Sequence, residues 1–250
     1  WQSLLARGEW EGEIWNRRKT GEIVPFRGSI SAVHDDNGHI ANYVGVFSDY
    51  SKAKEAEENL LLAQTYDSLT GLPNRQYCLE KIQQGVSSAT RDGYGLAVVL
   101  LDIDSFKLLN DTQGHDIGDT FLKTIADRLA EIKPENGILC RWGSDEFLLL
   151  LESAKNSSAV GHILQKLFGQ LAKPFLLPNH EVIPSACAGV SFYPQDADTT
   201  KGLVKAAETA LLRAKECGPA SINFFTPILA EKIHKKFEIA SELRRAVRND

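Results

Sequence analysis

The sequence predicts an α/β (α+β) protein, in which a mixed domain of strands and helices follows a short β-rich segment. Runs of strand character and runs of helical character alternate over residues 67–226, as in a sheet with helices packed around it. The first segment has a different period, because apolar and polar residues alternate from Val24 to Ala32 as along a half-buried strand. With 43% hydrophobic and 24% charged residues, the composition is that of an ordinary globular protein.

Residues 1–49 make up the β-rich segment. After the strand around Val24–Ala32, the run Asp36-Asn-Gly38 predicts a hairpin turn, because Asn and Gly tolerate positive φ. A further strand is expected over Tyr43–Ser48. Fewer than 50 residues bury too little apolar surface for a core of their own, so we interpret this segment as part of a larger domain.

Residues 50–66 predict a linker helix. The run from Ser51 to Glu58 is charged and favours a helix, and Ala53, Ala56, Leu60 and Ala63 follow at the 3-4-3 spacing of a two-stranded coiled-coil seam. The seam is shorter than two heptads. Two interpretations therefore stay open, a coil between two copies of the chain and a helix packed on its own domain.

Residues 67–227 form the mixed domain. Leu96–Leu101 is continuously apolar, as is typical of a strand at the centre of a sheet that is covered on both faces. The other expected strands are 138–142, 147–151, 182–192 and 222–225, and the expected helices are 116–132, 159–171 and 203–214. The strands at 138–142 and 147–151 flank Gly143-Ser144-Asp145-Glu146 and predict a hairpin. Residues 228–250 are charged and helical in pattern, and resemble a connector more than a core.

Charge and composition exclude some classes of function. A formal net charge of −5 argues against broad nucleic-acid binding, which needs a basic face. The longest apolar runs are far too short to span a bilayer, and the start of the chain does not resemble a signal peptide. The chain begins with Trp-Gln-Ser and contains no Met, so we expect a segment of a longer cytoplasmic protein, with any membrane anchor outside it.

The four cysteines are Cys78, Cys140, Cys187 and Cys217, and no two have the spacing of a zinc or thioredoxin-like motif. Cys140 and Cys187 lie in apolar, strand-like runs. We expect reduced core cysteines.

Two acidic clusters carry the predicted chemistry. Asp102-Ile-Asp104 follows the buried strand, and the turn into a helix at residues 105–107 would present main-chain N–H groups to phosphate oxygens. Asp145 and Glu146 stand at the tip of the hairpin. If strand and hairpin are neighbours, Asp102, Asp145 and Glu146 converge, and hard oxygen ligands of this kind favour Mg²⁺ together with substrate phosphates. The alternative is that these acids are solvated turn residues.

Four blocks in this region resemble the GGDEF family, the diguanylate cyclases. They are D-S-L-T-G-L-P-N-R at 67–75, L-D-I-D-S-F-K-L-L-N at 101–110 with G-H-D-I-G-D at 114–119, R-W-G-S-D-E-F at 141–147 and A-K-E-C-G at 214–218. The blocks occur in the order found in the family and cover most of the chain. The resemblance implies a central, mostly antiparallel sheet with flanking helices, related to nucleotidyl cyclases and polymerase palms. The implied reaction joins two GTP molecules into cyclic di-GMP across a homodimer.

The resemblance also implies roles for residues. Asp102, Asp145 and Glu146 would be catalytic and would hold Mg²⁺ with the Ile103 carbonyl, two ions in each active site if the domain is catalytic. The residues implied to bind GTP are Phe106, Lys107, Asn110, Asp119, Gly143, Ser144 and Lys215. Among them, Phe106 and Lys107 would offer main-chain N–H groups and Lys215 its ammonium to the phosphates, whereas Asn110 and Asp119 would read the guanine edge.

The sequence departs from the family pattern at three places. Ser144 replaces the second glycine of the signature, where a side chain takes space under the nucleotide and, if the position needs positive φ, costs roughly 1–2 kcal/mol. Pro219 stands where the family has an arginine that reaches the phosphates. Pro134-Glu-Asn-Gly137 stands where the product-inhibition site has R-x-x-D. We therefore favour a degenerate domain that binds GTP but cyclises it poorly or not at all.

The flanking segments resemble other signalling modules. W-E-G-E-I-W-N-R-R-K-T-G at 10–21 and Y-V-G-V-F-S-D at 43–49 are similar to the second half of a PAS sensor domain. The stretch 240–250 resembles the lead-in to an EAL phosphodiesterase domain, which implies a PAS–GGDEF–EAL protein dimerised through its GGDEF domain and linker helix. Three functions remain open: a regulatory GTP-binding module, an active diguanylate cyclase and a structural dimerisation spacer.

Overall fold

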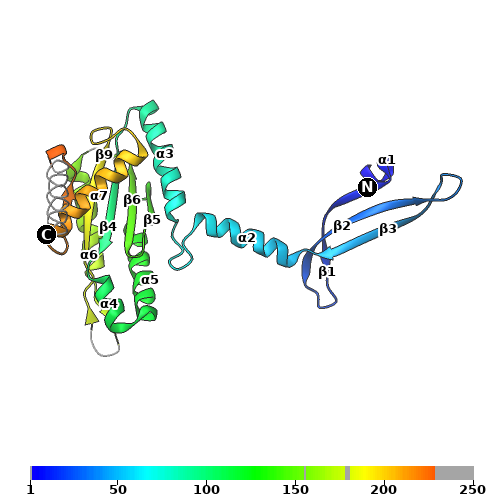
Figure 1. The fold of residues 1–250 in the computed structure, drawn as a ribbon, viewed down its shortest axis with the longest axis horizontal. Coiled ribbons are helices and arrows are strands. Elements are labelled where there is room, and N and C mark those ends of the chain that lie inside the picture. Colours follow the sequence, from blue (N-terminus) through cyan, green and yellow to red (C-terminus); the bar gives the residue numbers. More distant parts are fainter. Residues whose placement is uncertain (1, 155, 178–180, 229–250) are drawn as a thin grey trace, which may run out of the picture. The chain divides into compact units, whose positions relative to one another are not determined.

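The computed structural model describes the chain except for residues 1, 155, 178–180 and 229–250. The chain divides into two compact units, unit 1 (Trp1–Ala63) and unit 2 (Gln64–Asp250). Figure 1 labels most of the helices and strands of the two units. The predicted connector at 228–250 lies, from residue 229 onward, outside the described residues. The finer division of the chain into four segments stays a prediction.

Unit 1 contains a three-stranded antiparallel sheet of order β1-β2-β3. Helix α1 (Gln2–Arg7) precedes β1 (Glu9–Arg17), β2 (Ile23–His34) and β3 (Ile40–Asp49). The predicted turn is present between β2 and β3, where Gly38 has a φ of +81°. Many apolar side chains of the sheet are exposed, among them Trp15, Val46 and Phe47. This exposure is consistent with a segment that has too little surface to build a complete core.

Helix α2 (Ser51–Thr65) follows β3 directly, close to the predicted range of 50–66. Its first turn is capped by Asp49, whose Oδ1 accepts a hydrogen bond of 2.9 Å from the Ser51 N–H. Asp49 also pairs with Arg18 at the end of the first hairpin. Farther along the helix, Leu60, Leu61 and Leu62 are each more than half exposed. The structure therefore describes the helix, while its pairing with a second copy stays a prediction.

Unit 2 is built on a five-stranded sheet of order β10-β9-β4-β6-β5. The strands are β4 (Leu96–Ile103), β5 (Gly137–Arg141), β6 (Glu146–Glu152), β9 (Ala186–Tyr193) and β10 (Ile222–Phe224). All neighbours pair antiparallel except β9 and β10. The prediction of a mostly antiparallel sheet with flanking helices is confirmed, and so is the hairpin of β5 and β6.

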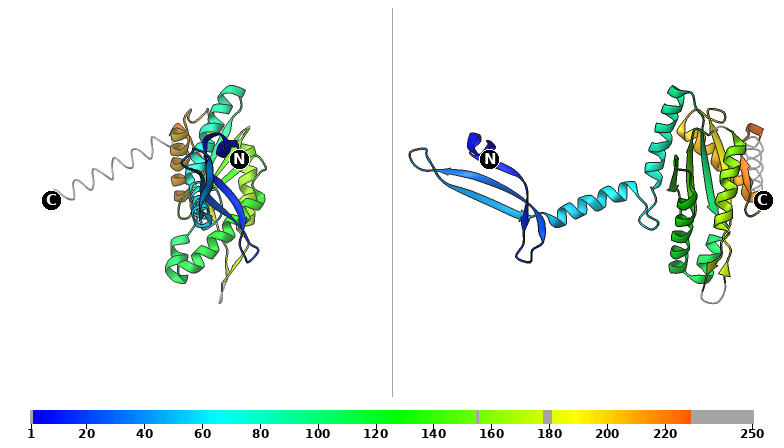
Figure 2. Two further views of the ribbon diagram at one scale, coloured as in Figure 1. Left: turned by 90° about the vertical axis from the view of Figure 1, so that its right-hand side faces the viewer. Right: turned by 180° about the vertical axis from the view of Figure 1, so that it is seen from behind.

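Helices cover both faces of this sheet (Figures 1 and 2). They are α3 (Arg75–Asp92), α4 (Phe106–Gln113), α5 (His115–Ile132), α6 (Ser157–Leu171) and α7 (Thr200–Cys217). Alternate residues of β4 enter two separate cores: Val99 and Leu101 pack with α5 and α6, whereas Val98 and Leu100 pack with α3 and α7. The continuous apolar run of β4 is thus explained, since every side chain of the strand is buried.

The side chain of Arg128 binds carbonyl oxygens at and just after the end of α6. The Arg128 guanidinium on α5 donates hydrogen bonds to the carbonyl oxygens of Leu171, Lys173 and Pro174, at 3.1, 2.5 and 2.9 Å. The last carbonyls of a helix lack partners within the helix, and a cation is the favoured partner there. Arg128 therefore fixes the exit of α6 against α5.

Two expectations about unit 2 are corrected. The strand expected over 182–192 is interrupted, because β8 (Glu181–Val182) pairs with β7 (Phe175–Leu176) and β9 begins only at Ala186. Pro184 lies in the break, where it has no N–H to donate to a ladder. Helix α3 was not expected, although Asn74 caps its start through the Tyr77 N–H and Gly93 ends it with a φ of +72°.

Candidate functional site

The carboxyl end of β4 and the tip of the β5–β6 hairpin are neighbours. In the sheet register Asp102 on β4 lies opposite Glu146 on β6. The Ile103 N–H donates a hydrogen bond of 3.1 Å to the Asp145 carbonyl oxygen, so the pairing of β4 with the hairpin continues one residue beyond Asp102 and Glu146. The structure therefore places Asp102, Asp145 and Glu146 on neighbouring segments at one end of the sheet, while their role as joint metal ligands stays a prediction.

Burial disfavours the ionised form of the carboxylates at this end of the sheet. Asp102 is only 7% exposed, and its burial raises its pKa above the ordinary value although the Lys215 ammonium opposes the shift. Burial also raises the pKa of Glu146, and the charges of Asp102 and Asp145 act in the same direction. The Lys215 Nζ lies 2.5 Å from Asp102 Oδ2 and partly offsets this charge. The edge is thus a place that attracts a cation.

The donor set suits Mg²⁺. Among the described residues, no group of three His, Cys, Asp or Glu side chains is close enough to form a ready-made metal cage. Mg²⁺ does not need such a cage, because it is usually held by one or two carboxylates while water and substrate phosphates supply the remaining ligands. Asp102 and Asp145, with the Ile103 carbonyl, offer hard oxygens of the required kind, and the raised pKa of buried Asp102 reflects negative charge that a cation would relieve.

The tip of the hairpin adopts an ordinary backbone at Ser144. The described non-glycine residues with positive φ are Ser105, Ser153 and Ala220, and Ser144 is not one of them. The strain that we considered for a serine at this position is therefore absent. The Ser144 hydroxyl instead donates a hydrogen bond of 2.6 Å to Asp145 Oδ1, so that it engages one of the predicted metal ligands. At Gly143 a Cβ atom would lie 2.7 Å from Glu146 Oε2, so the Glu146 carboxylate would have to shift to admit a side chain there.

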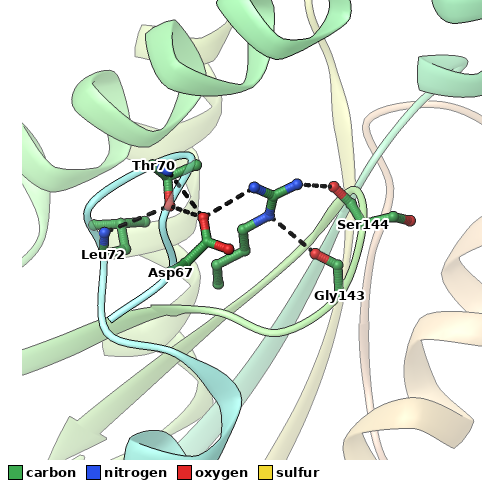
Figure 3. Close-up of polar contacts among 6 residues, drawn as sticks. Asp67, Thr70, Leu72, Gly143 and Ser144 are labelled. Atoms are coloured by element: carbon green, nitrogen blue, oxygen red, sulfur yellow. Dashed lines mark hydrogen bonds and ion pairs between the residues drawn. The ribbon is translucent and has the colours of Figure 1, made fainter. Parts of the chain in front are cut away.

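One arginine joins the tip to a neighbouring loop, and Figure 3 labels the bonding partners Asp67, Gly143 and Ser144. The Arg141 guanidinium donates to the Gly143 carbonyl at 3.1 Å and to the Ser144 carbonyl at 2.8 Å. It also forms an ion pair of 2.9 Å with Asp67 Oδ1, the same oxygen that accepts hydrogen bonds from the N–H and hydroxyl of Thr70. Arg141 is thus a positioning residue that joins the loop after α2 to the hairpin of the site.

A second loop beside the site is also fixed by hydrogen bonds. Asp104 Oδ2 accepts from the Ser185 hydroxyl at 2.5 Å and from the Ala220 N–H at 3.0 Å. This ties the residue after β4 to the start of β9 and to the turn that contains Pro219. Asp104 therefore has a structural role, whereas its motif neighbour Asp102 faces the site.

Helix α4 starts in the way a phosphate cradle requires. Ser105 precedes it in the left-handed region, with φ of +60°, and its side chain makes no capping hydrogen bond to the described residues. The first N–H groups of a helix have no acceptor within the helix, so those of Phe106 and Lys107 can serve a ligand. The Phe106 ring is buried and stacks on Phe121 at a centroid distance of 6.2 Å, while Lys107 is exposed.

The two predicted guanine readers lie on adjoining helices. Asn110 on α4 packs so tightly on Gly118 of α5 that a Cβ there would lie 1.8 Å from Asn110 Oδ1. This oxygen is buried and has no hydrogen-bond partner among the described residues. Asp119, the residue after Gly118, is exposed. An orphaned amide beside an exposed acid fits a ligand edge that carries both donors and acceptors, as guanine does.

Sequence reasoning missed Arg141 and Asp67 as partners. Both stand in the quoted motifs, but they are 74 residues apart, so that neither spacing nor period could pair them. The available signal was their charge, since an arginine directly before a turn and an aspartate in a turn-rich loop are common bonding partners for backbone groups.

Comparison with known proteins agrees with this geometry. The family model described as "Diguanylate cyclase, GGDEF domain" matches residues 64–220. The chain is 36% identical over 196 residues to the cyclic di-GMP phosphodiesterase NbdA of Pseudomonas aeruginosa, covering 78% of this chain and 25% of the relative. It is 32% identical over 192 residues to the bifunctional diguanylate cyclase/cyclic di-GMP phosphodiesterase MucR of the same species, covering 77% of this chain and 28% of the relative.

A solved structure shows the same likeness. The isolated GGDEF domain of TpbB (YfiN) from Pseudomonas aeruginosa matches with a TM-score of 0.65 and 30% identity, over 68% of this chain and 99% of that one. The chain spans about a quarter of the length of NbdA and MucR. Among the helices that the structure describes, none combines the length and apolar character needed to cross a bilayer.

Proposed function

Because this chain belongs to the GGDEF diguanylate cyclase family, we propose that its GGDEF domain binds GTP with Mg²⁺, cyclises it poorly or not at all, and acts as a regulatory module. Domains of this family occur in cyclic di-GMP signalling proteins, and the relatives named above include a phosphodiesterase and a bifunctional enzyme.

Metal binding would depend on the edge formed by β4 and the hairpin. Asp102, Asp145 and Glu146 would hold Mg²⁺ there, with the Ile103 carbonyl as a further ligand. The ion, when bound, would neutralise charge on the phosphates. Support comes from the adjacency of the three acids and from the raised pKa of Asp102 and Glu146, since carboxylates buried together gain most from a cation between them.

Nucleotide binding would use the residues around α4. Main-chain N–H groups of Phe106 and Lys107 would bind phosphate oxygens at the start of the helix, and the Lys215 ammonium would bind them from α7. Asn110 and Asp119 would bind the guanine edge. The buried, partnerless Oδ1 of Asn110 supports this, because an amide held in such a position is ordered before a ligand arrives.

The observation that carries the loss of turnover is the contact of Ser144 with Asp145. A glycine at this position has no hydroxyl, whereas the Ser144 hydroxyl donates to Asp145 Oδ1 at 2.6 Å, takes one of the two acceptor positions of that oxygen and would restrict how the carboxylate turns toward a metal. The side chain also takes space at the tip that the two glycines of the family leave open for a nucleotide. Misplacing a reacting group by about 1 Å can reduce a rate by roughly 10²-fold, so a binding site can survive a change that abolishes catalysis.

Two further departures support the same proposal. Pro219 stands in the turn tied to Asp104 and supplies neither a charge nor an N–H to a phosphate. At the position of the product-inhibition motif, the Pro134 carbonyl accepts the Gly137 N–H at 2.8 Å, and a Cβ at residue 137 would lie 3.1 Å from that carbonyl. The turn is therefore closed on itself, and Pro134 and Gly137 carry no group that would bind a product phosphate.

The decisive experiment combines a binding and a turnover measurement on the purified chain. Calorimetric titration with GTP and Mg²⁺ is expected to show binding, while chromatography of the same mixture detects little or no cyclic di-GMP. Turnover at about 1 s⁻¹ or faster, an ordinary enzymatic rate, would show an active cyclase instead. Absence of binding at saturating GTP with Mg²⁺ would favour a structural dimerisation spacer.

A paired substitution tests the reason for the low activity. Ser144→Gly combined with Pro219→Arg is expected to restore measurable cyclisation, because it frees Asp145 and returns a phosphate-binding cation. Addition of Asp145→Ala to this double variant serves as the control and should abolish the recovered turnover. If the double variant stays as inactive as the parent, some other defect limits catalysis.

The flanking segments complete the proposal. We interpret residues 1–49 as the second half of a PAS sensor, α2 as the helix that links sensor state to dimer geometry, and the natural protein as one that also carries an EAL phosphodiesterase. Occupancy of the GGDEF site by GTP would then regulate cyclic di-GMP hydrolysis. In the full-length protein GTP should change the hydrolysis rate, and Asp145→Ala should remove this response; an unchanged rate would refute the regulatory role.

A further inference from the structure

An ion pair between Lys215 and Asp102 joins the end of α7 to the end of β4. Lys215 lies in the last turn of α7, and its Nζ reaches Asp102 Oδ2 at 2.5 Å. The two side chains differ strongly in exposure, since that of Asp102 is 10% exposed and that of Lys215 is 44% exposed. A partly exposed ammonium therefore contacts a nearly buried carboxylate at the proposed metal site.

The ammonium meets an electrostatic need of the site. Asp102 carries a burial penalty, and the negative charges of Asp145 and Asp104 add to it. Lys215 is the group that opposes both effects, and it also favours ionisation of Glu146. A single positive charge on the flexible stem of Lys215 thus compensates several carboxylates of the ligand-free site.

We propose that Lys215 is a resident cation that occupies Asp102 until metal arrives and then moves to the phosphates of the nucleotide, so that divalent metal and nucleotide bind cooperatively. This rests on the proposed GTP site and goes beyond it, because it assigns the order of events to one side chain. An ammonium and a divalent ion repel each other at the same carboxylate oxygen. Lys215 must therefore leave Asp102, and a triphosphate is the acceptor that would receive it.

The structure gives Lys215 the means to exchange partners. Its exposed stem has rotamer freedom, and it carries three N–H donors in one compact charge. Pro219, four residues later in the chain, supplies no charge that could take over the phosphate. Metal would displace this lysine from Asp102, and an arriving anion would then bind the released ammonium, which is a linkage between two ligands.

The test measures metal binding with and without nucleotide. Mn²⁺ binding is followed by electron paramagnetic resonance in the wild-type chain, in Lys215→Gln and in Lys205→Gln, a matched change at an exposed lysine of the same helix. Without nucleotide, Lys215→Gln should bind Mn²⁺ about tenfold more tightly, since the competing charge is gone. With a non-cyclisable α,β-methylene GTP analogue the order should reverse, with Lys215→Gln about threefold weaker or more. Lys205→Gln should match the wild type throughout.

Three outcomes would overturn the proposal. Equal affinity of wild type and Lys215→Gln for Mn²⁺ alone would mean that Lys215 does not occupy the metal position. Tighter Mn²⁺ binding by Lys215→Gln in both states would mean that the lysine stays in place and acts only as a fixed charge. No binding of the analogue by the wild type, even with Mn²⁺, would refute the proposed function, and the coupling would fail with it while the metal-only result still reports on the resident cation.

A measurement on the unmodified chain guards against a folding defect in the variant. Saturating Mn²⁺ alone should release the Lys215 amine and increase its rate of acetylation several-fold, as quantified by peptide mass spectrometry. The amine of Lys205 should react at a constant rate. An unchanged rate at Lys215 would contradict displacement by metal.

Discussion

Removal of the Arg141 side chain should destabilise unit 2 more than any change at an exposed ion pair. The guanidinium makes hydrogen bonds of 2.9, 3.1 and 2.8 Å, to Asp67, Gly143 and Ser144. The Arg141 side chain is 12% exposed and that of Asp67 26%, so Arg141→Ala leaves a partly buried carboxylate without its cation. A hydrogen bond to a charged group contributes about 1.5–3 kcal/mol, and the two carbonyls add less because water can reach them. We expect a total loss of about 2–4 kcal/mol.

Thermal unfolding followed by circular dichroism at 222 nm measures this loss. For a domain of this size each kcal/mol shifts Tm by about 2–4 °C, so a loss of about 2–4 kcal/mol should lower the Tm of Arg141→Ala by roughly 4–16 °C. Arg91→Ala is the matched control, because Arg91 pairs at 2.8 Å with Asp92 but is 74% exposed; its effect should stay within about 2 °C. If Arg141→Ala and Arg91→Ala shift Tm equally little, the assigned role of Arg141 is wrong.

The pH dependence gives an independent check of the same network. Burial works against ionisation of Asp67, but hydrogen bonds from Thr70 and the Arg141 guanidinium outweigh it and hold the pKa of Asp67 below its ordinary value of 3.8. A carboxyl with a lowered pKa in the folded state contributes stability above its unfolded pKa and loses it as the pH falls through the folded value. The difference in Tm between wild type and Asp67→Asn should therefore be constant near neutrality and shrink below a pH of about 4. A difference that grows on acidification would contradict this assignment.

Three further predictions concern other parts of the chain. Arg128→Ala should cost about 1–3 kcal/mol, read from the urea midpoint, because three carbonyl acceptors at the end of α6 lose their donor. Ala220→Gly should raise stability by about 0.5–1 kcal/mol in the same assay, since Ala220 has φ of +56°; a loss would show that the turn is not strained. In unit 1, the side chain and N–H of Ser51 and the Arg18 guanidinium lower the pKa of Asp49 to about 2, so a carboxyl carbon titration by NMR should find its midpoint well below 3.8.

Much of the sheet could be predicted because its strands are strongly apolar. β4 is buried along its whole length, so its hydrophobic run could not be mistaken for a surface segment. The β5–β6 hairpin followed from two apolar runs around a short polar turn. The interruption before β9 was missed because Val182–Phe192 is mostly apolar or small and resembles one strand, although Pro184 has no N–H to donate to a ladder.

The sequence allowed us to predict which polar residues belong to the candidate site, but not their bonding partners. The acids at 102, 145 and 146 stand at chain reversals, and the fold brings their segments together through the register of β4 and β6. Partnerships across the fold were beyond reach: nothing in the sequence pairs Arg141 with Asp67, or Lys215 with Asp102 across 113 residues. The backbone at Ser144 was also open, because a serine tolerates several turn geometries and the sequence does not fix which is used.

The tight packing of Asn110 on Gly118 has a consequence for how α4 and α5 meet beside the proposed site. A Cβ atom at residue 118 would lie only 1.8 Å from Asn110 Oδ1. The amide can therefore hold its present position only because residue 118 has no side chain. Gly161 and Gly169 on α6 have nothing within 4 Å of such a Cβ, and alanine could replace either. Gly118 therefore determines how closely Asn110 can pack against α5, although it bears no functional group of its own.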